Sequence, residues 1–295
     1  MKRVSNALFR GDANKSASDD GGCPKTGVSV TASLLPYTVV VLAADRFTPD
    51  PVAVAGNASC KVMVPVAGKP MVMRVLDALT HAEDVESVIL CGPPKAVLDQ
   101  EPCLRERIGS GGVRWVPNHQ TPSASAYSVL KCVPPDVPVL LTTGDHAMLS
   151  VQMIDHFCRE ARRSRCDVVA GFVSHEMVTA TYPGMRRTAT RFRDGGICGC
   201  NLYAFVTPEG RIAADIWRQV EADRKTPWKM LNRLGWWVAV KYLMGRLSLS
   251  DGLDHISKRM GIRVGVILLP FPEASVDVDT VDDWHFVQDL MTKMP

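Results

Sequence analysis

The sequence predicts an α/β fold, a Rossmann-like three-layer sandwich in which helices cover both faces of a mostly parallel sheet. The first observation is that short apolar segments alternate with helical segments of about ten residues or more, which is typical of βαβ units. The second is that the apolar segments are nearly continuous: residues 37–44 read YTVVVLAA, as a strand buried on both faces requires. The third is a composition of 46% hydrophobic and 22% charged residues, which suffices for a large core.

The alternation runs through the first part of the chain. Val72, Val75, Leu76 and Leu79 recur at the spacing of one helix face. The expected strands are residues 37–44, 87–91, 113–116, 138–142 and 167–173, and the expected helices are residues 70–81, 95–108, 123–131 and 151–163. Because a helix connects each strand to the next, we expect these strands to be parallel.

The pattern then changes. Residues 188–192 and 198–205 flank the turn sequence RDGG, which predicts an antiparallel hairpin inserted into the sheet. A helical insertion is expected over about residues 208–260. A strand at residues 263–269 and a helix at residues 281–291 complete the fold.

These elements form one expected domain, residues 36–295. Residues 1–35 are rich in Ser, Asp, Gly, Asn and Lys without periodicity, so we expect a disordered N-terminal extension.

The overall charge argues against a nucleic-acid binder. The chain has 34 Lys and Arg against 31 Asp and Glu, a formal net charge of +3, without a dense basic run. Nine cysteines without framework spacing, and no secretory apolar segment near the start, indicate reduced thiols and a cytoplasmic location. No apolar run reaches the roughly 20 residues of a transmembrane segment.

Several aromatic residues gather in the helical insertion, namely Trp228, Trp236, Trp237 and Tyr242. We expect them to belong to a helix that packs on the domain. The alternative interpretation is a peripheral contact with a membrane surface.

In folds of this kind ligands bind at the carboxyl ends of the parallel strands. The first strand ends in Leu42, Ala43 and Ala44, which Asp45 and Arg46 follow. After a long loop comes Lys61, and then a short apolar stretch leading to Gly68, Lys69 and Pro70. A P-loop is excluded here, because its lysine must be followed by Ser or Thr.

A second segment is LLTTGD, which ends at Asp145. A carboxylate directly after an apolar strand and a glycine, at the ligand-binding edge, suits a hard cation. The alternative is a helix N-cap, but Ser150 is better placed to cap the helix that begins at residue 151.

A third segment, VDVDT, contains Asp277, Asp279 and Thr280. If it is extended, alternation puts Asp277 and Asp279 on the same face, where both could reach one cation. Thr280 suits the cap of the last helix.

In their order and placement, these three segments resemble the nucleotidyltransferases typified by molybdenum-cofactor guanylyltransferase, the MobA-like NTP transferase family. The resemblance implies that Leu42, Ala43, Ala44 and Arg46 bind the nucleotide. It implies that Lys61 neutralises phosphate charge. In this family the Gly-Asp pair supplies a carboxylate to Mg²⁺, which makes Asp145 a metal ligand and catalytic residue together with Lys61. Asp279, with Asp277, would complete the metal site.

The resemblance also implies roles for residues farther along the sheet. Ser123 would contact the nucleotide, with helix capping as its alternative role, and Asn201 would contact the acceptor. Arg187 could hold an anionic acceptor because guanidinium groups suit phosphate; the alternative is a solvated basic hairpin. One position departs from the pattern: Asp45 stands where the family usually has glycine.

The resulting hypothesis is a Mg²⁺-dependent nucleotidyltransferase. It would transfer NMP from an NTP to a phosphorylated or hydroxyl small-molecule acceptor and release pyrophosphate. One alternative is a glycosyltransferase of related fold that uses a nucleotide-sugar donor. Another, motivated by Asp45 and the glycine-poor loop after it, is a nucleotide-binding protein without activity.

Overall fold

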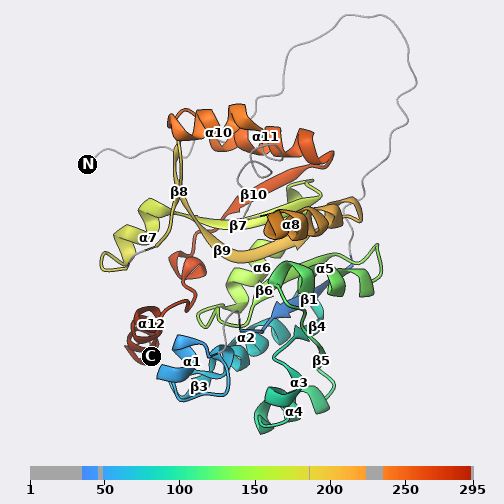
Figure 1. Ribbon diagram of the computed structural model, residues 1–295, viewed down its shortest axis with the longest axis vertical. Coiled ribbons are helices and arrows are strands. Elements are labelled where there is room, and N and C mark those ends of the chain that lie inside the picture. The colour runs from blue at the N-terminus through green and yellow to red at the C-terminus, as the bar shows by residue number, and fades with distance from the viewer. Residues whose placement is uncertain (1–34, 46–48, 186, 224–234, 294–295) are drawn as a thin grey trace, which may run out of the picture. The chain divides into compact units, whose positions relative to one another are not determined.

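A computed structural model of the chain describes residues 35–45, 49–185, 187–223 and 235–293. One eight-stranded sheet forms the centre of the structure (Figure 1). Its strands are β1 (Tyr37–Leu42), β4 (Val85–Cys91), β5 (Val113–Val116), β6 (Val139–Thr143), β7 (Val168–Ser174), β8 (Thr190–Phe192), β9 (Gly195–Phe205) and β10 (Val264–Leu268). The expected extension, residues 1–35, lies outside the described residues apart from Leu35.

The sheet is mostly parallel, as predicted. Its strand order is β10-β7-β9-β6-β1-β4-β5, and β8 pairs with β9. Strands β4 and β6 flank β1 in parallel, β5 continues the sheet beyond β4, and β10 pairs with β7 in parallel. The predicted hairpin is also present, as the antiparallel pair β8–β9. Strand β9 inserts between β6 and β7 and is antiparallel to both.

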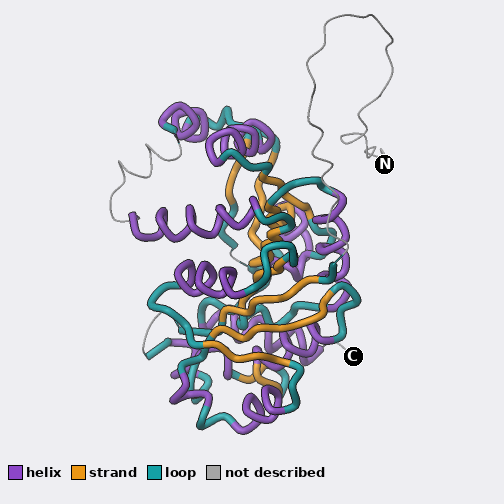
Figure 2. The backbone as a smooth tube through the Cα atoms, turned by 90° about the vertical axis from the view of Figure 1, so that its right-hand side faces the viewer, coloured by secondary structure: helices purple, strands orange, loops and turns teal. Residues whose placement is uncertain are grey.

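Helices cover both faces of the sheet (Figure 2). They are α1 (Pro51–Ala55), α2 (Met71–Thr80), α3 (Lys95–Leu98), α4 (Pro102–Gly109), α5 (Pro122–Cys132), α6 (Val151–Arg163), α7 (His175–Thr181), α8 (Ile212–Asp223), α10 (Trp236–Leu243), α11 (Leu249–Met260) and α12 (Val281–Lys293). Short 3₁₀ turns are η1 (Lys61–Met63), η2 (Glu209–Arg211) and η3 (Pro272–Ser275), and β2 (Pro65–Val66) pairs with β3 (Lys69–Pro70) in a small separate ribbon.

The central strand β1 shows why there are three layers. Val39 and Val41 point to one face and pack in the same core cluster as Leu76 of α2 and Phe157 of α6. Val40 points to the other face, where its cluster includes residues of α5 and α8. All three valines are fully buried. Burial of each contributes about 1.5 kcal/mol or more, so a strand covered on both sides holds the layers together.

Some predicted elements differ from the structure. The helix expected over residues 95–108 divides into α3 and α4, because Pro102 has no N–H and disfavours a helical conformation at the residue before it. Helix α1 lies in what the sequence indicated as a loop; Asp50 caps it by accepting the N–H groups of Val52 and Ala53. The helix α7, capped by Ser174, was also missed.

The helical insertion contains η2, α8, α10 and α11, with residues 224–234, including Trp228, outside the described residues. The expectation of a packing helix at the tryptophans is only partly met, because no residue of α10 is buried. Within the described residues, no helix combines the length and hydrophobicity that crossing a bilayer requires.

Candidate active site

The carboxyl ends of β1 and β6 meet at one edge of the sheet. The strands pair in register, so that Leu42 lies beside Thr143. The N–H of Gly144 donates to the carbonyl of Leu42 over 2.8 Å. A Cβ at position 144 would lie 3.1 Å from Val62 Cγ1, so a glycine suits the close approach of η1 to this turn. The loops after both strands therefore open on the same spot, as the fold class predicts for a ligand site.

Three side chains that are distant in sequence converge at this spot. Lys61 Nζ lies 2.6 Å from Asp145 Oδ2 and 3.0 Å from Asp279 Oδ1. The side chains of Lys61 and Asp145 are 13% and 15% exposed, whereas that of Asp279 is 50% exposed. The group of Lys61, Asp145 and Asp279, here called the lysine–aspartate cluster, is thus buried on one side and open to solvent at Asp279.

Mutual stabilisation keeps the buried members of this cluster charged. Burial alone would lower the pKa of the Lys61 ammonium, but Asp145 and Asp279 outweigh it, and the pKa is raised. Burial would raise the pKa of the Asp145 carboxyl, but the neighbouring Lys61 outweighs burial and holds this pKa below its usual value. At neutral pH the ammonium and the Asp145 carboxylate are therefore both ionised.

The second oxygen of Asp145 provides a test of the metal hypothesis. Asp145 Oδ1 is buried and accepts no well-formed hydrogen bond within the described part of the chain, although the nearby Thr143 hydroxyl helps to lower the pKa of this carboxyl. A buried carboxylate oxygen without strong hydrogen bonds is costly, and a divalent cation would satisfy it. Among the residues described, no three or more His, Cys, Asp and Glu side chains form a ready-made metal site. Mg²⁺ typically takes one or two protein carboxylates together with phosphate oxygens and water, so Asp145 and Asp279 fit this cation.

Asp45 has a structural partner. Its two carboxylate oxygens accept the backbone N–H of Lys61 at 3.0 and 3.2 Å. Burial raises the pKa of Asp45, and the Lys61 N–H partly offsets the rise. The residue that departs from the family pattern thus anchors the start of η1, and with it the lysine of the cluster.

A second acidic position lies beside the cluster. Asp277 pairs with the guanidinium of Arg187, and its Oδ2 accepts a hydrogen bond from Asn201 Nδ2 at 2.6 Å. Burial is the main cause that raises the pKa of Asp277 to about 6, although Arg187 opposes the rise. Asn201 adopts φ 50° within β9, an uncommon backbone conformation for a residue other than glycine.

This arrangement corrects the expectation that Asp277 and Asp279 share one face of a strand. Residues 276–279 form no strand, so the rule of alternation does not apply. The Asp277 carboxylate faces Arg187 and Asn201, whereas the Asp279 carboxylate faces Lys61. The predicted acceptor residues Arg187 and Asn201 therefore come together, and Asp277 joins them.

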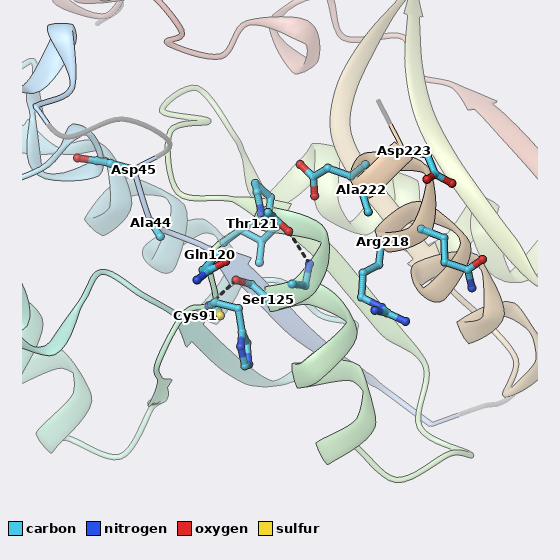
Figure 3. A pocket seen from close by; sticks show the side chains of 15 residues that line it. Ala44, Asp45, Cys91, Gln120, Thr121, Ser125, Arg218, Ala222 and Asp223 are labelled. Atoms are coloured by element: carbon cyan, nitrogen blue, oxygen red, sulfur yellow. Dashed lines mark hydrogen bonds between the residues drawn. The ribbon is translucent and has the colours of Figure 1, made fainter. Parts of the chain in front are cut away.

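A pocket of about 490 Å³, drawn in Figure 3, lies between the end of β1, the start of α5 and the end of α8. Leu42, Ala44 and Asp45 form its wall on the side of β1, and the start of α5 and the end of α8 form the others. Figure 3 shows Thr121 and Ser125 of the α5 segment opposite Arg218 and Asp223 of α8. The remaining lining residues are Cys91, His119, Gln120, Pro122, Ala124, Gln219, Glu221 and Ala222. Because Asp45 lines the pocket and also bonds to Lys61, pocket and cluster are adjacent.

Helix α8 is tied to the start of α5 by one carboxylate. Glu221 Oε2 accepts the N–H of Ser123 at 3.2 Å and also the Ser123 hydroxyl. Thr121 Oγ1 accepts the N–H of Ala124 and so caps α5. Ser123 is fully buried and does not line the pocket. Its side chain instead holds Glu221, which does line the pocket.

The other predicted nucleotide-binding residues divide into three groups. Leu42 and Ala44 line the pocket. Ala43 points into the core and is 1% exposed. Arg46 lies outside the described residues.

Sequence reasoning missed the pocket residues of α8, above all Arg218 and Glu221. Their spacing carries no signal for a pocket, since Arg218 and Asp215 resemble an ordinary surface pair three residues apart on a helix. A signal did exist for Asp45: an acidic residue in place of the family's glycine indicates a specific partner.

Comparison with known proteins identifies the family of the chain. The MobA-like NTP transferase domain matches residues 39–197. Among solved structures, a hypothetical transferase from Thermus thermophilus is 28% identical with a TM-score of 0.69, covering 85% of this chain and 100% of that one. A 4-diphosphocytidyl-2C-methyl-D-erythritol synthase from Anaerococcus prevotii has a TM-score of 0.53 at 13% identity, covering 88% and 97%. A CMP:2-keto-3-deoxy-manno-octonic acid synthetase in complex with CTP has a TM-score of 0.51 at 14% identity, covering 88% and 100%. No curated protein matches the chain.

The last two structures share the fold with this chain. The family match is broader evidence, because it spans more than half of the chain and includes Leu42, Lys61 and Asp145. The chain belongs to the MobA-like NTP transferase family and is a nucleotidyltransferase.

Proposed function

We propose that the protein transfers NMP from an NTP to a small phosphorylated or hydroxyl acceptor in a Mg²⁺-dependent reaction that releases pyrophosphate. The observation that carries this proposal is the contact of Lys61 Nζ with both Asp145 and Asp279 beside the pocket. The Lys61 ammonium lies between two carboxylates and next to a cavity of nucleoside size. This arrangement suits the binding of a metal-bound triphosphate.

The nucleoside occupies the pocket between β1, α5 and α8 in this proposal. Leu42 and Ala44 offer small apolar contacts, and Gln120, Gln219 and Glu221 offer hydrogen-bonding groups around the base and ribose. The triphosphate then extends past Asp45 toward the lysine–aspartate cluster.

Lys61 stabilises the charge that develops on the phosphate oxygens. An ammonium group has three donors, and in the described structure Asp145 and Asp279 accept two of its hydrogen bonds. The third is available for a phosphate oxygen at the open side of the cluster.

Asp145 and Asp279 are the residues proposed to hold Mg²⁺, which when bound would neutralise the triphosphate and polarise the phosphoryl group. The buried Oδ1 of Asp145, which accepts no well-formed hydrogen bond, and the exposure of Asp279 support these assignments.

The acceptor binds on the side of Arg187 and Asn201 in this proposal. One acceptor oxygen forms a bond to the α-phosphorus while the bond to the pyrophosphate oxygen breaks, and pyrophosphate leaves. No covalent enzyme intermediate is needed. Asp277 already pairs with the guanidinium of Arg187, so an anionic acceptor would bind there by sharing or displacing this ion pair.

The test is pyrophosphate release from each of the four NTPs with a panel of sugar phosphates, polyols and cofactor precursors, with Mg²⁺ and with EDTA. Asp145→Asn should abolish Mg²⁺-dependent release while its circular dichroism spectrum stays native. Asp99→Asn, which changes an exposed carboxylate of another ion pair, serves as the matched control.

Undiminished Mg²⁺-dependent turnover by Asp145→Asn would refute the assignment. Consumption of a nucleotide sugar without pyrophosphate release would instead identify a glycosyltransferase. NTP binding without turnover across the panel would identify a binding protein.

A further inference from the structure

Helix α10 carries an exposed apolar surface that the transferase chemistry does not use. Trp236, Trp237 and Leu243 are 58%, 62% and 83% exposed. The two indole rings stack with their centroids 4.2 Å apart. Large apolar side chains gathered on a surface in this way indicate an interaction site.

The geometry of the helix places these side chains on one face. Residues three and four apart lie on the same side of an α-helix. Trp236, Val240 and Leu243 form one row, and Trp237, Lys241 and Met244 form the adjacent row; we call these six residues the α10 face.

The opposite side of the helix contacts the protein. Tyr242 meets Phe192 of β8 edge to face, with ring centroids 6.3 Å apart. Just before the helix, a Cβ at Gly235 would lie 2.8 Å from His255 of α11, so this end also lies close to the domain. The contacts of α10 therefore turn the α10 face toward solvent.

The stretch of sequence that contains α10 has a one-sided charge. Residues 224–250 contain six of the 34 basic residues of the chain and none of the 31 acidic ones. The rest of the chain consequently has three more acidic than basic residues, so this segment accounts for the whole positive excess. Lys241 and Arg246, both exposed, belong to its described part. The neighbouring helix α11 is balanced, with Asp251 and Asp254 against Lys258 and Arg259.

We propose that the α10 face binds the surface of an anionic lipid membrane as a peripheral anchor. Tryptophans partition into the interfacial zone of a bilayer, where the indole ring is apolar and its N–H stays hydrated. Leu243 and Met244 reach the acyl boundary, and Lys241 and Arg246 contact lipid phosphates.

A second copy of the chain fits the α10 face less well than a membrane surface does. A helix of this length is only about 12 Å long, too short for the roughly 800 Å² that each partner buries in a standard interface. In a two-fold dimer the same surface would also meet itself, which would bring like charges together. A nucleic acid would satisfy the cations but not the row of Trp236, Val240 and Leu243.

The experiment is co-sedimentation of the full chain with vesicles of phosphatidylcholine alone and with vesicles that also contain the anionic lipid phosphatidylglycerol, whose negative surface potential attracts basic side chains. We expect binding to the anionic vesicles, weakened by salt. Lys241→Glu should weaken it by more than the about fivefold that each surface cation contributes. The double variant Trp236→Ala, Trp237→Ala should abolish it, and the corresponding double Phe variant should restore part of it.

Two variants control for general changes of the surface. Leu268→Ser removes an exposed apolar side chain on β10, and Lys95→Glu reverses an exposed charge on α3; both should bind vesicles as the wild type does. Native circular dichroism spectra show that each variant is folded. Pyrophosphate release without vesicles should be unchanged in all of them, so a failure here is distinguishable from a failure of the proposed chemistry.

Three results would overturn the membrane anchor. The first is that the wild type does not sediment with anionic vesicles. The second is that the double Ala variant sediments as well as the wild type. The third is that the α10 face is occupied otherwise: a dimer in analytical ultracentrifugation that the double Ala variant dissociates, or tighter binding to a labelled oligonucleotide than to vesicles.

Discussion

The carboxylate of Asp45 accepts the backbone N–H of Lys61 with both of its oxygens, at 3.0 and 3.2 Å. Through this contact Asp45, in the loop that follows β1, fixes the start of the turn that carries Lys61 of the lysine–aspartate cluster. An acidic side chain close to the proposed phosphate site is tolerable because its oxygens already have a donor.

Asp45→Ala should therefore lower kcat/KM by about tenfold, the order of one hydrogen bond to a charged group. The expected cause is a loosened η1 that no longer holds Lys61 between Asp145 and Asp279. Asp45→Asn keeps one acceptor oxygen and should retain most of the activity. Steady-state kinetics of both variants tests this, and equal loss in the two would show that the charge of Asp45, and not its acceptor role, is what matters.

Lys61→Met should have opposite effects on turnover and on metal binding. Removal of a positioned charge from a transition state typically costs about 10²–10³-fold in rate. The same change frees Asp145 and Asp279 from their ammonium partner, so Mg²⁺ should bind more tightly, as isothermal titration calorimetry would show. Lys69→Met, which removes a lysine paired with Asp77 outside the cluster, should alter neither quantity. Weaker Mg²⁺ binding by Lys61→Met would contradict the assignment of these carboxylates as metal ligands.

Ser123 and Glu221 should be energetically coupled. Glu221 accepts both the N–H and the hydroxyl of Ser123 and so joins α8 to α5. A double-mutant cycle with Ser123→Ala and Glu221→Ala should give a coupling of about 1–3 kcal/mol in the free energy of unfolding. Additive losses would mean that this contact does not hold the pocket wall. Arg218→Ala, on the same helix, provides a control cycle with Ser123→Ala.

Asp167 gives the fold a pH dependence that is separate from the active site. It accepts hydrogen bonds from Arg263 Nη2 and from the Arg263 backbone N–H, each at 2.7 Å, and from Thr207 Oγ1 at 3.0 Å. Burial would raise the pKa of Asp167, but these hydrogen bonds outweigh it and hold the pKa below the usual value of 3.8. The unfolded chain therefore takes up the proton first as the pH falls.

The stability that Asp167 contributes is thus present above about pH 5 and is lost as the pH falls through the usual range of a carboxyl group. Asp167→Asn should lower the free energy of unfolding by about 1–3 kcal/mol at pH 7. The difference from the wild type should shrink toward pH 3 in urea titrations at a series of pH values. The exposed control Asp99→Asn should follow the wild type throughout, and a difference that stays constant with pH would contradict this account.

The sequence predicted the fold and the meeting point of distant residues because both follow from general rules. The continuous apolar run of residues 37–44 indicated a buried parallel strand, and strands of one direction place their following loops together. Lys61, Asp145 and Asp279 could therefore be expected at one edge of the sheet, and the structure brings them within hydrogen-bonding distance.

The predictions from sequence that were wrong or missing mostly concern features that depend on contacts between distant segments. The alternation argument required Asp277 to lie on a strand, but the backbone that follows η3 forms no strand. Arg187 and Asn201 decide where the Asp277 carboxylate points. Pro102 could have revealed the break between α3 and α4 in advance. The role of Glu221 could not be predicted in this way, because no local pattern specifies which helix will lie over α5.

The pocket is assembled from two stretches of chain. The β1 and α5 walls lie within residues 39–197, the range of the family match, whereas the α8 wall lies beyond it. If the pocket holds the nucleoside as proposed, preference for one base can diverge through substitutions at Arg218, Gln219 or Glu221 while Lys61 stays intact. Relatives that differ in α8 are therefore expected to use different nucleotides for the same bond-making step.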